Sequence, residues 1–257
     1  MKLMFAVCLA FSAFAEEIDL SRYERSVYSQ NGEDGILSKL VQLIHPKPGF
    51  CIEFGAFDGV TGSNTYMLRR QGWDCLLLDR GYDVPEYKLR KEYITAQNIN
   101  QLFEKYNVPG QVDLMSIDID FNDFYIWKAM EEKYNASIVL IEYNASIPPT
   151  EDKVVKYHPY YIGDGTNYFG ASILAMYRLG RAKGYSLVYA EETGTNLFFV
   201  RDEIIEELSE RGITFKHLND VEAIYRRPTY GKSEHGGHPD DPKKRPYFTS
   251  EELMKQK

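Results

Sequence analysis

The stretch CIEFGAFDGV, Cys51–Val60, decides the fold of this chain. Strand-forming residues surround one carboxylate, Glu53, and the strand pattern breaks at Gly55, where the absence of a Cβ lets backbone and ligand approach closely. Gly59 offers the same freedom soon afterwards, and Asp58 adds a second carboxylate between the two glycines. The stretch therefore predicts the first β-turn-α unit of a doubly wound α/β fold, with a ligand held at the turn.

The charges of this turn indicate the kind of ligand. A dinucleotide pyrophosphate prefers bare backbone amides at a helix N-terminus, and Glu53 and Asp58 would repel it. The sulfonium and α-ammonium groups of S-adenosylmethionine are cationic, so the same carboxylates would attract them. The next predicted strand, Trp73–Leu78, ends at Asp79, about twenty residues after the turn, where an acid can accept hydrogen bonds from the ribose hydroxyls of either cofactor.

Six segments between Tyr28 and Arg201 form a wider set of motifs. They are YSQNGEDGIL (Tyr28–Leu37), EFGAFDG (Glu53–Gly59), SNTYML (Ser63–Leu68), GWDCLLLD (Gly72–Asp79), LMSIDID (Leu114–Asp120) and TGTNLFFV (Thr193–Val200). The set resembles the FkbM-type branch of the class I S-adenosylmethionine-dependent methyltransferases. The first motif is more specific than the other five, because a Ser-Gln-x-Gly-Glu-Asp run ahead of the first strand is not a general feature of Rossmann folds. The resemblance covers most of the chain and implies a methyltransferase that uses S-adenosylmethionine.

The resemblance also implies which residues form the site. The cofactor-binding residues that it assigns are Glu53, Gly55, Ala56, Asp58, Gly59, Asn64, Asp79 and Asp118. In this assignment Asp79 is the ribose contact and Asp118 is the acid at the end of the fourth strand. The chain departs from the family pattern at Phe121, where many members carry Gly, and at Asp120, near which a Glu is common. The acceptor side of the pocket therefore follows the family less closely than the cofactor side.

Several further acids are expected at the same crevice, because ligands of open α/β sheets bind at the carboxyl ends of the strands. We predict Asp118 and Glu142 as catalytic residues that position the acceptor or remove a proton from its hydroxyl. The polar residues that follow the fourth strand, Asp120, Asn122 and Asp123, are interpreted instead as caps of the next helix.

Metal binding is another possible use of these residues. Asp118, Glu142 and Asn144 supply oxygen ligands of the kind that Mg²⁺ or Ca²⁺ accepts. Some class I O-methyltransferases hold a divalent ion at this position, but the resemblance to the FkbM branch does not require one. S-adenosylmethionine is therefore the predicted cofactor, and no metal ligand is assigned.

The rest of the chain fits one domain of this class. We predict a three-layer α/β, Rossmann-like methyltransferase fold whose sheet is mostly parallel and closes with a C-terminal antiparallel pair, Tyr185–Ala190 and Asn196–Arg201. Other expected strands are Tyr93–Ala96, Val112–Ile119 and Ser137–Tyr143, and the expected helices are Glu33–Ile44, Ile99–Tyr106, Tyr125–Tyr134, Ser172–Lys183 and Ser250–Gln256. The predicted organisation is a signal peptide over 1–15, a methyltransferase-like domain over 16–226 and a polar C-terminal tail over 227–257.

The first residues have the pattern of a cleavable signal peptide. Met1-Lys2 is a basic start, Leu3–Phe14 is an apolar run too short to span a bilayer, and Ala13-Phe14-Ala15 is a small-x-small cleavage site. The alternative interpretation is a membrane-facing or buried first helix. The signal predicts a secretory-pathway, periplasmic or secreted protein without a stable membrane span after cleavage, and a cytoplasmic protein if the signal is not used.

A secretory location conflicts with the use of S-adenosylmethionine as a cofactor, because S-adenosylmethionine is made in the cytoplasm. Either the compartment is supplied with the cofactor, or the signal is not used, or the fold was kept for binding after catalysis was lost, and the sequence leaves all three open. Signal cleavage would remove Cys8 and leave Cys51 and Cys75. We expect these two to be buried thiols in neighbouring strands rather than a disulfide.

The remaining features bear on partners and on alternative functions. The formal net charge of −8 argues against a nucleic-acid partner, which would need clustered Lys and Arg. The family resemblance implies O-methylation of a small-molecule or glycan acceptor, and the aromatic stretch Tyr157–Tyr161 could form a wall or lid for it. The main alternative is a secreted, non-catalytic binding or effector protein that retains the fold. An NAD-dependent oxidoreductase is disfavoured by Glu53, Asp58 and the closing strand pair.

Overall fold

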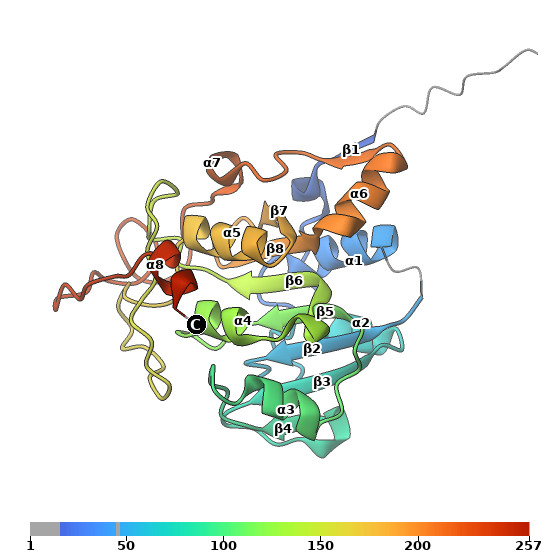
Figure 1. Ribbon diagram of the computed structural model, residues 1–257, viewed down its shortest axis with the longest axis horizontal. Coiled ribbons are helices and arrows are strands. Elements are labelled where there is room, and N and C mark those ends of the chain that lie inside the picture. The colour runs from blue at the N-terminus through green and yellow to red at the C-terminus, as the bar shows by residue number, and fades with distance from the viewer. Residues whose placement is uncertain (1–15, 45–46, 257) are drawn as a thin grey trace, which may run out of the picture.

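The structure, a computed structural model, describes residues 16–44 and 47–256 (Figure 1). The predicted signal peptide and Cys8 lie outside the described residues. A seven-stranded sheet forms the middle layer, in the order β4 (Leu89–Lys91), β3 (Asp74–Asp79), β2 (Phe50–Phe54), β5 (Val112–Ile117), β6 (Ala136–Glu142), β8 (Asn196–Arg201) and β7 (Tyr185–Ala190). The first five of these strands pair in parallel, and β8 runs antiparallel to both of its neighbours. The predicted α/β fold class, with its mostly parallel sheet and C-terminal antiparallel pair, is confirmed.

Helices cover both faces of this sheet, because its central strands are apolar on both sides. One face is covered by α1 (Glu33–Ile44), α2 (Tyr66–Arg70) and α6 (Asp202–Glu210), which contribute to one hydrophobic cluster. The opposite face is covered by α3 (Ile99–Lys105), α4 (Asp123–Ala129) and α5 (Ile173–Ala182), whose apolar side chains belong to the other large cluster. None of the helices in the part of the chain that the structure describes is long and apolar enough to cross a membrane.

The shorter elements lie around this sandwich. They are a second, two-stranded sheet of β1 (Glu16–Ile18) and β9 (Ile213–Phe215), the 3-10 helices η1 (Leu20–Tyr23), η2 (Pro85–Tyr87) and η3 (Glu132–Tyr134), and the helices α7 (Val221–Ile224) and α8 (Ser250–Lys255). The expected C-terminal helix is thus present as α8. Thr249 and Glu252 form a capping box at its start, and the buried Leu253 joins the main core.

The segment between α7 and α8 packs back onto the domain. Phe248 exchanges two backbone hydrogen bonds with Val154, each with a nitrogen–oxygen distance of 2.8 Å. The ring of Tyr247 lies 4.9 Å from that of Tyr168, between centroids. The polar composition of this segment correctly indicates that it has little regular structure. Its few apolar residues, such as Phe248 and Tyr247, nevertheless attach it to the rest of the domain.

Two predicted elements are wrong in position. The edge strand expected at Tyr93–Ala96 lies earlier, as β4, because the buried Leu89 is the residue that pairs with Leu77 of β3. After β4 the chain leaves the sheet, and Ile94 packs in the main core. The helix expected at Tyr125–Tyr134 begins at Asp123, and it ends at Ala129 before the separate 3-10 helix η3.

Cys51 and Cys75 form a disulfide, so the expectation of two free buried thiols is wrong. The residues face each other in the register of the neighbouring strands β2 and β3, with Cα atoms 4.5 Å apart, which is within the range that a disulfide requires. Sequence reasoning placed both cysteines in adjacent strands but could not give the register that brings them opposite each other.

The disulfide leads to a direct prediction about thiol reactivity. When the purified protein is denatured without reductant and treated with iodoacetamide, neither Cys51 nor Cys75 is expected to be alkylated, because neither carries a thiol. Prior reduction should expose both, and peptide mass spectrometry distinguishes the two states. Full alkylation without reductant would show that the pair is reduced.

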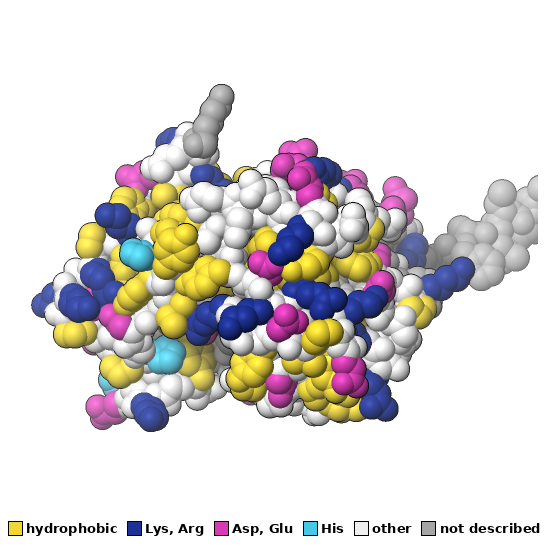
Figure 2. All heavy atoms as spheres, turned by 90° about the horizontal axis from the view of Figure 1, so that it is seen from below, with side chains coloured by type: hydrophobic (Ala, Val, Ile, Leu, Met, Phe, Trp, Pro, Cys, Tyr) yellow, Lys and Arg dark blue, Asp and Glu magenta, His cyan; other side chains and the backbone are white. Residues whose placement is uncertain are grey.

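The surface carries charges of both signs. In Figure 2, Lys and Arg side chains lie in a band across the middle of the view, with acidic and hydrophobic side chains between and around them. Exposed ion pairs such as Lys88–Asp74 and Lys133–Glu131, at 2.5 and 2.8 Å, illustrate this mixing. Such exposed pairs contribute little to stability.

Candidate functional site

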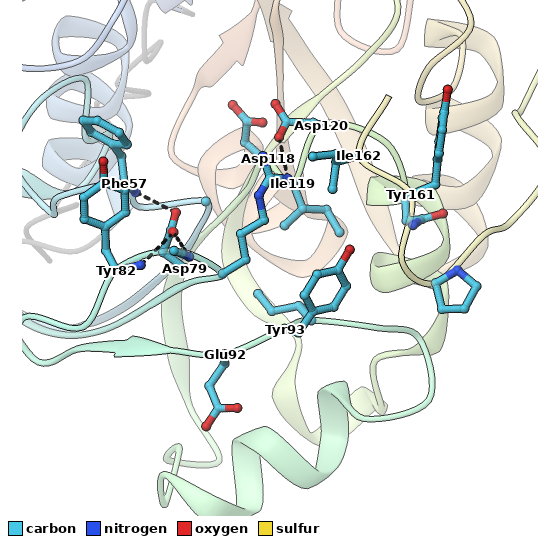
Figure 3. Close-up of a pocket in the computed structure, with 16 residues that line it drawn as sticks. Phe57, Asp79, Tyr82, Glu92, Tyr93, Asp118, Ile119, Asp120, Tyr161 and Ile162 are labelled. Carbon is cyan, nitrogen blue, oxygen red and sulfur yellow. Dashed lines mark hydrogen bonds and ion pairs between the residues drawn. The ribbon is translucent and has the colours of Figure 1, made fainter. Parts of the chain in front are cut away.

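A cavity of about 400 Å³ lies at the carboxyl ends of β2, β3 and β5 (Figure 3). Of the predicted cofactor-binding residues, Gly55, Asp79 and Asp118 line it. These three come from the ends of three neighbouring strands, as expected for an open α/β sheet, where ligands bind outside the carboxyl ends of the strands. The cavity is therefore the candidate site.

Gly55 allows the ends of β2 and β5 to approach each other closely. Its φ is +67°, a conformation that favours glycine. A Cβ built on Gly55 would lie 1.8 Å from the carbonyl oxygen of Asp118, far inside contact distance. The absence of a side chain at Gly55 therefore allows the turn after β2 to lie in contact with the backbone of Asp118.

Asp79 lies at the end of β3 with its carboxylate organising two loops. Its Oδ2 accepts a hydrogen bond from the backbone amide of Phe57 at 2.9 Å, and its Oδ1 accepts from Gly81 and Tyr82 at 2.6 and 3.3 Å. A carboxylate has about four lone-pair positions, and three are used here. Asp79 can therefore accept one more hydrogen bond from a ligand without losing a protein partner.

Glu53 stands behind the cavity wall and does not line it. The side chain is 3% exposed, and its carboxylate accepts hydrogen bonds from the hydroxyls of Ser63 and Thr65 and from the backbone amide of Asn64. These bonds hold the segment between β2 and α2 against the strand. Glu53 thus shapes the loop from behind, and its assignment as a cofactor-binding residue stays a prediction.

The other predicted loop residues also lie outside the cavity lining. Asp58 accepts from the amides of Val60 and Thr61, and these bonds lower its pKa although partial burial acts to raise it. Asn64 is buried and donates to the hydroxyl of Ser116 in β5 at 3.0 Å. Ala56 and Gly59 are buried, and Gly59 has a φ of +80°. The four residues shape and anchor the loop.

The first motif of the resemblance supports this loop from the N-terminal side. The carboxylate of Asp34 accepts hydrogen bonds from three successive amides, those of Val27, Tyr28 and Ser29, at 2.8, 2.6 and 2.8 Å. Ser29 in turn pairs with Gly62 in an isolated β-bridge. The motif is therefore a structural clamp that joins the segment before α1 to the loop after β2.

Sequence reasoning missed Arg80 as a cavity residue. Its guanidinium lies 3.1 Å from the carboxylate of Asp120, which follows β5, so an ion pair joins two walls of the cavity. The aromatic rings of Phe57 and Tyr82 also line the cavity and contact each other edge to face, with centroids 4.5 Å apart. The sequence shows that a basic or aromatic residue follows a strand, but it does not show whether the side chain of that residue points into a cavity.

The aromatic stretch expected to wall the pocket does reach it. Pro159, Tyr161 and Ile162 line the cavity (Figure 3), and Asn122 holds their loop by donating to the carbonyl of His158 at 2.9 Å. His158 itself is exposed. Asn122 is thus a loop anchor and makes no side-chain cap for α4, contrary to the interpretation from sequence.

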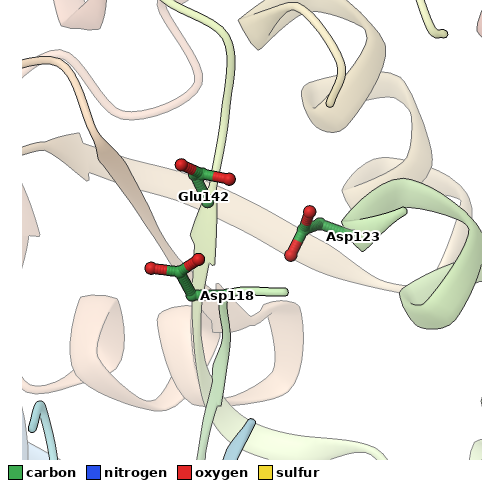
Figure 4. Close-up of side chains that lie close together, drawn as sticks. All are labelled: Asp118, Asp123 and Glu142. Atoms are coloured by element: carbon green, nitrogen blue, oxygen red, sulfur yellow. The ribbon is translucent and has the colours of Figure 1, made fainter. Parts of the chain in front are cut away.

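The two predicted catalytic acids lie next to each other, together with a third acid. Asp118 after β5, Asp123 in the first turn of α4 and Glu142 at the end of β6 each offer an oxygen within 4.8 Å of the other two (Figure 4). Asp123 was expected to cap α4, but its Oδ1 accepts from the amide of Ile119 at 2.8 Å and its carboxylate faces the other acids. Asn144 has other partners: its amide nitrogen donates to the carbonyls of Asn167 and Phe169, and its Oδ1 accepts from the backbone amide of Ser146 at 3.0 Å.

Burial and mutual repulsion shift the titration of these acids. Burial, followed by the charge of Asp120, raises the pKa of Asp118 to about 7. The pKa values of Asp123 and Glu142 are raised by burial and then by the charge of Asp118. Three adjacent carboxylates without a compensating cation are costly to ionise together.

No protein-family model and no curated protein matches the chain. Among solved structures, the chain is similar to the CMeT domain of the citrinin polyketide synthase, with a TM-score of 0.32 and 10% sequence identity. The likeness covers 66% of this chain and 51% of that one, so the chain spans about half the length of that structure. The function therefore has to be inferred from the geometry of the cavity.

Proposed function

We propose that the protein is an S-adenosylmethionine-dependent methyltransferase of the FkbM type that methylates an oxygen of a small or saccharide-like acceptor. The observation that carries this proposal is the acid-lined cavity between the Gly55 turn and the strand ends that bear Asp79 and Asp118. The acceptor class rests on the sequence resemblance alone.

The cavity fits the chemistry of this cofactor. Its volume of about 400 Å³ lies within the usual range of small-molecule sites. Asp79 has one acceptor position left for a ribose hydroxyl, and the rings of Phe57 and Tyr82 offer apolar faces for a base. Arg80 would oppose a cationic ligand, but its ion pair with Asp120 offsets that charge.

A dinucleotide fits less well. Its pyrophosphate would meet the carboxylates of Asp79, Asp118 and Asp120 at the strand ends, with one guanidinium already paired. The antiparallel β8, inserted between β6 and β7, is also not typical of dinucleotide-binding sheets. Both features favour S-adenosylmethionine over NAD.

The acceptor side of the site is assigned to Asp118 and Glu142. When bound, S-adenosylmethionine supplies an electrophilic methyl group. Asp118, which lines the cavity beside the Gly55 turn, would orient the acceptor hydroxyl in line with that methyl group. Glu142 stands behind Asp118, and the loop bearing Tyr161 would cover the acceptor and exclude water.

We also propose a secretory-pathway location, supported by the pattern of the N-terminal residues and by the Cys51–Cys75 disulfide. Disulfides persist in oxidising compartments and are rare in the cytosol. Catalysis there requires a local supply of S-adenosylmethionine.

Calorimetric titration of the purified protein with S-adenosylmethionine and S-adenosylhomocysteine, with and without Mg²⁺, tests the cofactor. Binding at micromolar affinity or better is expected. If neither ligand binds under any condition, the non-catalytic binding or effector protein becomes the better account. NADH binding without S-adenosylmethionine binding would favour an oxidoreductase.

Asp79→Ala is expected to weaken S-adenosylmethionine binding by about 1.5–3 kcal/mol, because it removes a charged hydrogen-bond acceptor from the cavity wall. The measurement is the same calorimetric titration. Asp83→Ala is the matched control, since Asp83 is exposed, follows in the same loop and makes an ion pair with Arg90 at 3.9 Å. Equal affinity of the Asp79→Ala variant and the wild type would refute the ribose assignment.

A further inference from the structure

Asp118, Asp123 and Glu142 come from three different elements and converge on one point. One oxygen from each lies within 4.8 Å of the oxygens of the other two. In Figure 4 the carboxylate of Asp123 points from α4 toward the space between Asp118 and Glu142. The three backbones are fixed by the β5–β6 pairing and by the packing of α4, so the convergence is built into the fold.

Two buried oxygens of this cluster have no partner. Asp123 is fully buried, at 0% exposure, and only its Oδ1 is engaged, by the amide of Ile119. Its Oδ2 and the Oε2 of Glu142 are both inaccessible and lack a hydrogen bond. Buried polar atoms in folded proteins are nearly always paired, so these two oxygens call for a ligand that the polypeptide does not supply.

Among the described residues, no basic side chain pairs with the cluster, and the guanidinium of Arg80 pairs with the neighbouring Asp120 instead. The neighbouring charges that act on Asp118 are those of Asp120, Glu33 and Glu53, all of them negative. Burying carboxylates without a counter-ion is unfavourable, so a cation at this point would stabilise the folded protein.

We propose that Asp118, Asp123 and Glu142 bind one hard divalent cation, of the class of Mg²⁺, Mn²⁺ or Ca²⁺. The donor set consists of carboxylate oxygens only, which these ions prefer, and it contains no Cys or His that would select a softer metal. Asp118 also lines the cavity, so water or an oxygen of a bound ligand can complete the coordination from that side. In this arrangement Asp118 and Glu142 position an acceptor through the cation.

Mn²⁺ binding followed by electron paramagnetic resonance tests this site without any methyl-transfer assay. Titration of the purified protein with Mn²⁺ is expected to show one bound ion, and competition with Mg²⁺ and Ca²⁺ ranks the natural candidates. Asp123→Asn and Glu142→Gln keep the side-chain shapes and are each expected to weaken Mn²⁺ binding by about tenfold or more. Asp74→Asn is the control and should change the affinity by less than about threefold, since Asp74 is exposed, lies at the start of β3, away from the strand ends that carry the cluster, and pairs with Lys88.

The outcomes separate this proposal from the methyltransferase assignment. Absence of Mn²⁺ binding at millimolar concentration overturns the site, whatever the affinity for S-adenosylmethionine. Stoichiometric binding that both Asp123→Asn and Glu142→Gln retain overturns it too, because the ion would then lie elsewhere. Thermal unfolding shows whether each variant folds. If one of the two variants does not fold, the Mn²⁺ affinity of the other variant tests the site.

Discussion

The Gly55→Ala variant is expected to lose about 4 kcal/mol of its free energy of unfolding and to lose S-adenosylmethionine binding. The new Cβ would lie 1.8 Å from the carbonyl oxygen of Asp118. That oxygen cannot withdraw easily, because β2 and β5 are paired up to Glu53 and Ser116, immediately before the contact. The φ of +67° adds a cost of about 1–2 kcal/mol for any residue with a Cβ. Accommodating the methyl group therefore means separating the two strand ends that form the cavity.

Gly72→Ala is the matched control for this effect. Gly72 has a φ of +92°, so it carries a similar backbone cost, but a Cβ there meets nothing within 4 Å. Urea denaturation followed by circular dichroism measures both variants. Gly72→Ala should lose about 1–2 kcal/mol and keep its ligand affinity. Equal losses in the two variants would show that the close approach at Gly55 has no special energetic role.

The fold could be predicted from sequence because its signals are local. The strands Tyr185–Ala190 and Asn196–Arg201 have the predicted bounds, since both are mostly apolar and are joined by a polar turn around Gly194. The edge strand was misplaced because β4 has only three residues and a single buried side chain, Leu89, too few to create a pattern.

The site could be predicted only as a set of strand-end residues, without their partners. Glu53 was correctly placed beside the turn, but the hydroxyls that bind its carboxylate belong to Ser63 and Thr65, and nothing local indicates that they fold back onto it. Asp123 has the sequence position of a first-turn helix acid, yet it turns back toward β5 and faces Asp118. Local rules give a residue's element, whereas the direction of its side chain depends on the packing of the whole domain.

Asp34→Ala is the second change with a large expected effect, about 3–4 kcal/mol in the free energy of unfolding. The variant loses three charge-assisted hydrogen bonds to the amides of Val27, Tyr28 and Ser29, each of the kind that contributes about 1.5–3 kcal/mol on its own. The total is below their sum, because the bonds share one acceptor oxygen and the amides of the exposed Val27 and Tyr28 can turn to water. Urea denaturation measures this loss.

The same substitution should also weaken cofactor binding, although Asp34 lies outside the cavity lining. Ser29 bridges to Gly62, so loosening the clamp releases the loop that Glu53 holds from the other side. Asp34→Asn is the graded control, since an amide keeps one acceptor oxygen but no charge, and its loss of stability should fall between wild type and Asp34→Ala. If Asp34→Ala unfolds at the same urea concentration as wild type, the motif that most strongly marks the family resemblance has no structural role. In that case the clamp described here would be wrong.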